Sequence, residues 1–132
     1  MGAWDYGPFD NDGALDLLGE LDGVDDVAAA VTRAMREMLD ADDYIEGPDM
    51  SGAVAVACLV AARRSRSPEA GNASTWLTAN PFDVSDDLRK LAAETLERAL
   101  RPDDNELYDL WAEAEALDIW TTRLQPYRTA LR

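Results

Sequence analysis

The ten residues from Ala53 to Ala62 are all apolar, with no charged, polar or glycine residue among them. A helix that is apolar on every side is normally buried at the centre of a fold, because it has no face suited to water. Three valines in the run are also compatible with a strand, but the alanine content and the length favour a helix. The sequence therefore predicts a central buried helix over residues 51–64, around which the rest of the chain must pack.

Four further segments have apolar residues at every third or fourth position, the spacing of amphipathic helices. Before the central helix, residues 40–49 are polar and contain Gly47 and Pro48, which predicts a break in the helical structure there. Near the end of the chain, Pro126 is expected to kink or end the last helix. The four predicted helices span residues 12–22 with Asp12 as N-cap, 24–40, 85–101 with Ser85 as N-cap, and 104–126 with Asp104 as N-cap.

The first eleven residues combine aromatic side chains with glycine and proline, which argues against a helix in this lead. Trp4, Tyr6 and Phe9 are expected to cover the core, because large aromatic side chains contribute most when they are buried. The alternative is an exposed aromatic recognition surface.

Residues 65–82 are rich in Ser, Pro, Gly and Asn and predict a long connection between helices. Trp76 and Phe82 are the residues expected to anchor this connection in the core. Taken together, the pattern predicts an all-α fold: a single-domain bundle of about five helices over residues 1–132, preceded by an irregular aromatic N-terminal lead.

The chain contains no histidine and a single cysteine, which excludes several kinds of chemistry. Ser–His–Asp and Cys–His catalysis and histidine-based zinc sites need histidine, and an internal disulfide needs two cysteines. The one thiol, Cys58, lies in the apolar run and is expected to be an unreactive packing residue. No other catalytic arrangement is evident, so we expect a protein that is not an enzyme.

The chain has 27 acidic and 12 basic residues, a formal net charge of −15. Residues 1–46 alone hold 13 acids and two bases. A negative field of this kind repels nucleic acid and anionic membranes and attracts basic partners or cations. We therefore expect a basic protein partner, with no nucleic acid and no membrane as partner, although acidity also serves plain solubility. No signal peptide is expected, and the predicted location is cytoplasmic.

Acidic residues are densest in two segments. The first is the break after residue 39, where Asp40, Asp42, Asp43 and Glu46 are the candidate partner-binding residues. The alternative for this segment is a solvated acidic loop, with cation binding as a minority case.

The second acidic segment holds Asp10, Asp12 and Asp16, whose carboxylates would suit Ca²⁺ or Mg²⁺. The spacing does not follow an EF-hand, because Leu15 and Leu21 fall where that loop needs glycine and glutamate. The alternative is helix capping, with the side chain of Asn11 or Asp12 accepting backbone N–H bonds.

Basic residues are expected mainly in structural roles. Arg63, Arg64 and Arg66 form a cluster predicted to lie at the C-terminal end of the central helix and pair with nearby acids, rather than bind nucleic acid. Residues 85–101 contain acid–base pairs four residues apart, predicted to form a solvent-exposed face. These pairs are Asp86 with Lys90, Glu94 with Arg98, and Glu97 with Arg101.

Residues 2–12 read Gly-Ala-Trp-Asp-Tyr-Gly-Pro-Phe-Asp-Asn-Asp and are followed by Ala14-Leu15-Asp16. This opening resembles that of an uncharacterised bacterial family of small proteins, the domain of unknown function numbered 4259, which reads Gly-x-Trp-Gly-x-Gly-x-Phe-acid-Asn-Asp. Asp5 stands where the family usually has glycine. The segment Glu106-Leu107-Tyr108-Asp109-Leu110-Trp111 resembles the family's Glu-Leu-x-x-Leu-Trp. The resemblance implies one domain of about this length and no particular activity.

Three functions are compatible with these observations. The first is a non-enzymatic acidic binding protein, of the inhibitor or immunity-protein kind, that engages a basic protein partner. The alternative is a divalent-cation-binding module that uses the Asp-rich N-terminal segment or the Asp40–Asp49 loop. The third and weakest is a metal-dependent hydrolase built on the same acids. No resident cofactor is expected beyond such a cation.

Overall fold

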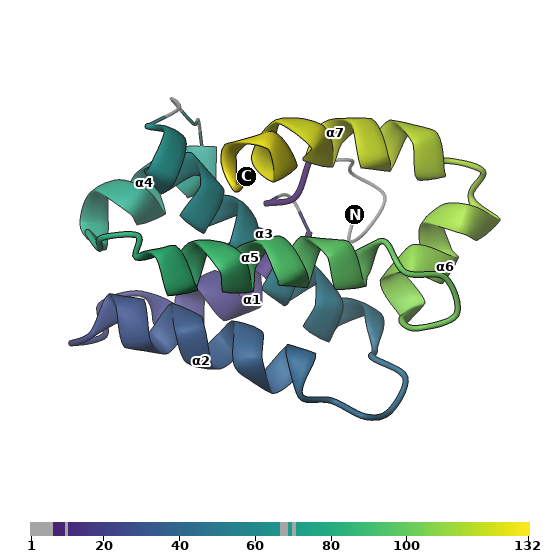
Figure 1. Cartoon of the computed structure of the whole chain (residues 1–132), viewed down its shortest axis with the longest axis horizontal. Coiled ribbons are helices and arrows are strands. Elements are labelled where there is room, and N and C mark those ends of the chain that lie inside the picture. The colour runs from purple at the N-terminus through teal and green to yellow at the C-terminus, as the bar shows by residue number, and fades with distance from the viewer. Residues whose placement is uncertain (1–6, 10, 67–68, 70) are drawn as a thin grey trace.

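The computed structural model describes residues 7–9, 11–66, 69 and 71–132, and it is all-helical (Figure 1). The prediction of an all-α fold is confirmed, but the prediction of about five helices is wrong. Over the described ranges there are seven helices: α1 (Asp12–Leu21), α2 (Val27–Leu39), α3 (Gly47–Ser65), α4 (Gly71–Ala79), α5 (Asp86–Ala99), α6 (Glu106–Glu113) and α7 (Leu117–Ala130). None of them is long and apolar enough to cross a membrane.

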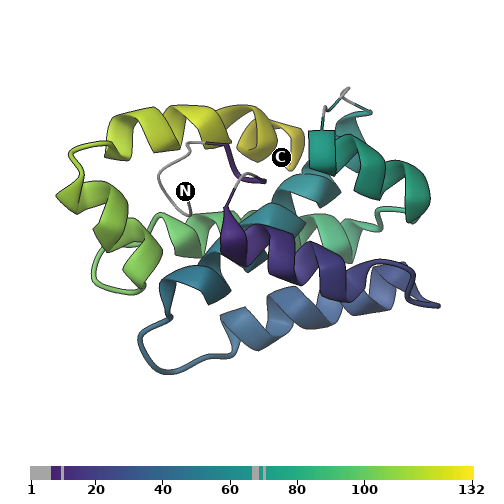
Figure 2. The same cartoon turned by 180° about the vertical axis from the view of Figure 1, so that it is seen from behind.

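Helix α3 is the centre of the molecule and packs against all six other described helices. In Figure 1, α5 crosses in front of it, and in the opposite view of Figure 2, α1 crosses on the other side. Every residue from Met50 to Ala62 is buried. The predicted central helix is therefore confirmed, and the strand alternative is wrong.

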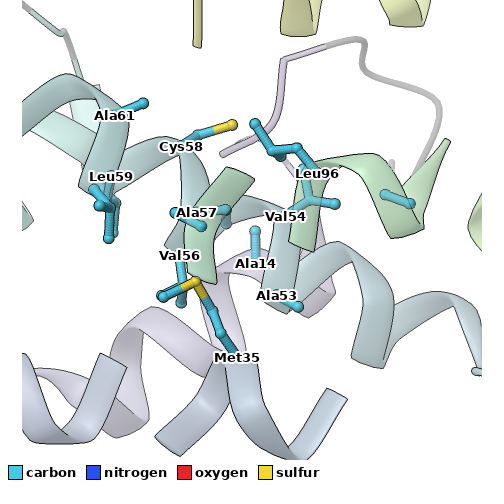
Figure 3. Packing of buried hydrophobic residues seen from close by; sticks show 14 of the residues in the cluster. Ala14, Met35, Ala53, Val54, Val56, Ala57, Cys58, Leu59, Ala61 and Leu96 are labelled. Carbon is cyan, nitrogen blue, oxygen red and sulfur yellow. The ribbon is translucent and has the colours of Figure 1, made fainter. Parts of the chain in front are cut away.

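Side chains from three neighbouring helices close the core around α3 (Figure 3). Met35 of α2 lies beside Val56 of α3. Leu96 of α5 and Ala14 of α1 pack against other sides of α3. Cys58 is fully buried among these residues, and burial raises the pKa of its thiol well above the usual value. The predicted packing role of this cysteine is confirmed.

Small residues allow α1 to approach α3 closely. A Cβ atom built on Gly13 would lie 2.8 Å from the Cα of Pro48, and one built on Gly52 would lie 3.0 Å from the Cδ2 of Leu17. Pairs four residues apart on each helix therefore interlock, as neighbouring ridges and grooves do in tight helix packing.

The break predicted between helices is confirmed for residues 40–46, but Gly47 and Pro48, which were expected to belong to it, begin α3. Proline is well tolerated in the first turn of a helix, because its missing N–H would have no helical partner there. The backbone N–H of Gly47 donates to Glu106 Oε1 at 2.7 Å, so a side chain of α6 caps α3 from outside.

The predicted long connection contains the short helix α4. Its Gly, Asn, Ser and Thr residues have low helix propensity, so tertiary contacts must hold it. The indole N–H of buried Trp76 donates to the carbonyl of Leu18 at 2.9 Å. Asn80, which is 2% exposed, accepts from the N–H of Gly23 and donates to Asp22. Trp76 is thus the anchor that the sequence predicted, and Phe82 packs edge-on against it.

The predicted long helix over residues 104–126 is two helices. After Ala114, Glu115 adopts a left-handed conformation with φ of 58°. Its N–H donates to the carbonyl of Ala112, and the N–H of Ala116 donates to that of Trp111. These two bonds form a Schellman motif, which ends α6. The left-handed position of such a motif is usually glycine, and because Glu115 occupies it here, the end of the helix was not visible in the sequence. Helix α7 then continues through Pro126 to Ala130.

Asparagine and serine, more than aspartate, cap the helices. Asn11 accepts from the N–H of Ala14, and Asn105 accepts from that of Tyr108, each at 2.8 Å. The predicted caps Asp12 and Asp104 are therefore wrong by one residue, and the capping alternative is confirmed for Asn11. Ser85 caps α5 as predicted.

Phe9 is buried and packs edge-on against Tyr127, as predicted for the aromatic lead. Trp4 and Tyr6 lie outside the described residues.

The ion pairs predicted for residues 85–101 are confirmed only for Asp86 and Lys90. Glu97 pairs with Arg128 of α7 instead, at 2.8 Å. Arg98 is buried, so the face predicted to be solvent-exposed includes an interior residue.

Candidate functional site

The α2–α3 loop, residues 40–46, is held against the connection between α5 and α6. The N–H of Ile45 donates to the carbonyl of Asp104, and the N–H of Glu106 donates to the carbonyl of Ile45 at 2.8 Å. These bonds make an isolated parallel bridge between Ile45 and Asn105. In both Figures 1 and 2 the loop and this connection lie on the same side of the molecule. The loop is therefore fixed near the end that leads into α3, which differs from the alternative of a simply solvated loop.

Arg98 holds the first half of this loop from inside. Its guanidinium donates to the carbonyls of Met38, Leu39 and Ala41 at 3.2, 2.8 and 2.9 Å. Its Nε donates to Asp104 at 3.2 Å, and the two side chains are 11% and 14% exposed. One buried cation thus neutralises the carbonyl end of α2 and one carboxylate together.

Tyr44 fixes the outer edge of the loop by donating its hydroxyl hydrogen bond to Asp109 of α6. Tyr44 as a whole is 53% exposed. This bond, with the nearby charges of Glu106 and Glu113, raises the pKa of Tyr44 to about 12. The phenol must stay protonated to donate, so the stabilisation is complete below its ordinary pKa of 10.0 and is lost as the pH rises through about 12.

Replacing Asp109 with asparagine should return the ionisation of Tyr44 towards the ordinary tyrosine range of about 10. The measurement is the difference in phenolate absorbance between each protein and its Tyr44→Phe counterpart over an alkaline titration. Glu113→Gln is the matched control, because it removes one nearby negative charge and leaves the carboxylate that accepts from Tyr44 in place. If Tyr44 of the unmodified protein ionises with the other tyrosines, the assigned bond is wrong.

A groove of about 640 Å³ opens between α1, the end of α2, the α2–α3 loop and the start of α3. We call it the acidic groove. Its partly exposed apolar residues include Leu17 and Met38, and it lies close to the contact of Gly13 with Pro48. Six exposed carboxylates line it, and none of its described lining residues is basic: the six are Asp16, Glu20, Glu37, Asp43, Glu46 and Asp49.

The acidic groove joins the two acidic segments that the sequence singled out. Asp16 comes from the candidate cation site, and Asp43 and Glu46 come from the candidate partner-binding residues. Asp40 and Asp42 are exposed on the same loop, and Asp12 is exposed on α1, but none of the three lines the groove. Asp10 lies outside the described residues.

Sequence reasoning left two groove carboxylates, Glu20 and Glu37, out of both predicted sites. Glu20 lies four residues after Asp16, so the shared helix face was a usable signal. Asp49 was included only through the Asp40–Asp49 loop, as a candidate for cation binding. Glu37 of α2 had no sequence signal, because only the packing of the helices brings it to the groove.

The structure brings no three metal-ligating acids close together anywhere in its described residues. The groove acids line a hollow about as large as a small-ligand pocket, whereas carboxylates bind Ca²⁺ at about 2.3–2.6 Å. The arrangement is therefore one for several separate positive charges, and it offers no support for the hydrolase prediction.

The arginine cluster holds other helices in place. Arg63 donates to the carbonyls of Leu77 and Asn80 at the C-terminal end of α4, and Arg64 donates to the carbonyl of Ala130 at the end of α7. Arg63 also lies 5.0 Å from the ring centre of Phe82. Arg63 and Arg64 thus have a structural role, but their bonds go to carbonyls near the ends of α4 and α7, and not to α3 or to the nearby acids that the sequence predicted as partners.

No curated protein and no solved structure matches this chain at a significant level. One family matches over most of the length, from residue 2 to residue 123, and it is described as a domain of unknown function, DUF4259. The resemblance drawn from the opening segment is therefore confirmed, and the chain belongs to the DUF4259 family.

Proposed function

We propose that this protein is a non-enzymatic binding protein that engages a basic protein partner through the acidic groove. The observation that carries the proposal is the lining of the groove, which combines six carboxylates with apolar side chains and includes no described basic residue. Solubility alone would be served by acids spread over the surface and needs no hollow with an apolar lining.

Each part of the groove supports a different part of binding. The carboxylates attract lysine and arginine side chains and speed the encounter, an effect that weakens as salt is added. The partly exposed side chains of Leu17 and Met38 can take an apolar side chain of the partner, and such burial supplies most of the affinity in protein interfaces. Methionine adapts well to irregular shapes, which suits Met38 to this contact.

The net charge of −15 argues against nucleic acid as partner, because a polyanion would have to overcome it. We place the encounter in the cytoplasm, as expected from the sequence, and regard the protein as of the inhibitor or immunity-protein kind. A partner with a catalytic or nucleic-acid-binding basic surface fits that role.

The test measures binding of a lysine-rich helical peptide with one leucine at its centre, across a range of salt concentrations. Asp43→Asn, Glu46→Gln and Asp49→Asn are combined in one groove variant. We expect its affinity to fall about tenfold at low salt, because three rim charges at up to about 1 kcal/mol each are removed. The salt dependence of binding should fall as well.

The matched control combines Asp87→Asn, Glu94→Gln and Asp118→Asn, which removes three exposed acids of α5 and α7 away from the groove. We expect this control to retain most of the affinity. Equal losses in the two variants would show that net charge alone attracts the peptide and would overturn the groove as the site. A pull-down from the native host at low and high salt would then identify the natural partner.

A further inference from the structure

We infer that Arg98 is a positioning residue for the acidic groove: it fixes the α2–α3 loop in its binding conformation although it does not line the groove itself. The inference rests on the proposed function, since it concerns how that groove is held ready. The supporting observations are the burial of Arg98 and its bonds to Ala41 in the loop and to Asp104 in the α5–α6 connection behind it.

The guanidinium contacts the chain where it leaves α2 and enters the groove. Met38 and Ala41, whose carbonyls accept from Arg98, are themselves groove-lining residues. Arg98 is 9% exposed, and its planar group uses both terminal nitrogens and Nε at once. An arginine fork can satisfy several fixed acceptors in this way, and a lysine ammonium cannot match that geometry.

Asp104 connects Arg98 to the second half of the loop. Its carboxylate accepts from Arg98, and its backbone carbonyl accepts from the N–H of Ile45. Ile45 lines the groove between Asp43 and Glu46. Arg98 is therefore linked through one residue to the segment that carries two of the groove carboxylates.

A loop held in this way presents its charges at fixed separations. Binding then orders little of the groove, so less of the interaction energy is lost to conformational entropy. If Arg98 only stabilised the fold, its loss would affect binding no more than any equally destabilising change far from the groove.

Arg98→Lys is the test variant, because it keeps the positive charge beside Asp104 and loses the fork. Arg63→Lys is the matched control. Arg63 also donates from α3 to carbonyls of another segment, at Leu77 and Asn80. It lies 16 residues along α3 from Gly47, about 24 Å from the groove end of that helix.

The experiment measures three quantities for the full-length wild type, both arginine variants and the groove variant. They are the affinity for the lysine-rich peptide, the dependence of that affinity on salt, and amide hydrogen exchange at Ile45 and Gly47. For Arg98→Lys we expect faster exchange at Ile45 and a three- to tenfold loss of affinity (on the order of 1 kcal/mol) with an unchanged salt dependence, since no groove charge is removed. For Arg63→Lys we expect neither effect.

The outcomes separate the two proposals. Peptide affinity that falls equally in both arginine variants, or in neither, overturns the positioning role and leaves the groove proposal standing. A loss in Arg98→Lys together with a flatter salt dependence also overturns it, because that result would mean a direct charge contact. Absence of peptide binding by the wild type overturns the proposed function, and the positioning inference with it.

Discussion

Replacing Gly13 with alanine should lower the free energy of unfolding by about 3 kcal/mol, at the upper end of the usual cost of overpacking. The new Cβ would lie 2.8 Å from the Cα of Pro48 and nearer still to its carbonyl oxygen. These are backbone atoms of α3, so they cannot turn aside as a flexible side chain could, and α1 would have to move away from the central helix. The measurement is chemical denaturation of both proteins, followed by the helical signal.

Gly19 of the same helix is the control for this experiment. A Cβ built there meets nothing within 4 Å. Alanine has the higher helix propensity by about 1 kcal/mol, so Gly19→Ala should stabilise the protein slightly. The two substitutions have the same chemistry and opposite expected signs. A stabilising effect at both positions would contradict the close approach of α1 and α3.

Replacing Asn105 with alanine should cost about 3 kcal/mol, more than the loss of an ordinary helix cap. The side chain is fully buried and accepts the N–H of Tyr108, which caps α6. Its amide also donates to the carbonyls of Arg98 and Ala99 at the end of α5. Removing it leaves polar groups on both helices without their partners in the interior.

Asn11→Ala is the comparison for Asn105, because Asn11 has the same type and the same capping bond to the third residue of its helix. Loss of that cap alone should cost about 1 kcal/mol. Thermal and chemical unfolding of the two variants measure the difference. Equal costs would mean that the bonds from Asn105 to the end of α5 contribute nothing.

The parts of the fold that could be predicted from sequence are those fixed by local pattern. The apolar run of α3 identified the buried centre, and Ser85 marked the start of α5, because propensity and periodicity act within one helix. The start of α3 could not be found in the same way. Its capping carboxylate, Glu106, lies 59 residues further along the chain.

Contacts between distant parts of the chain also explain the other differences between the predicted and the observed helices. Helix α4 is held by the hydrogen bond of Trp76 to α1, against the low propensity of its own residues. Glu115 ends α6 in a conformation that normally favours glycine, stabilised by the Schellman bonds. Tertiary contacts decide these boundaries, and a single sequence shows them only weakly.

For the candidate site, the sequence identified acidic segments and the fold decided which of their members meet. Asp16, Asp43 and Glu46 reach one groove, while Asp40 and Asp42 of the same loop do not. Glu37 lines the groove only because α2 packs beside it. The direction of a loop side chain depends on how the loop is held against the rest of the fold. Here it is held by the backbone bonds of Ile45 and by the bond from Tyr44 to α6.

The capping of helix ends by arginine also affects how copies of the protein meet each other. Of the 12 basic residues, Arg63, Arg64, Arg89 and Arg98 donate to carbonyls of helices or segments other than their own. Three of these four, Arg63, Arg89 and Arg98, are buried or half-buried, so they add little positive charge to the outer surface. Two copies of the protein, each with a net charge of −15, therefore repel one another at low salt.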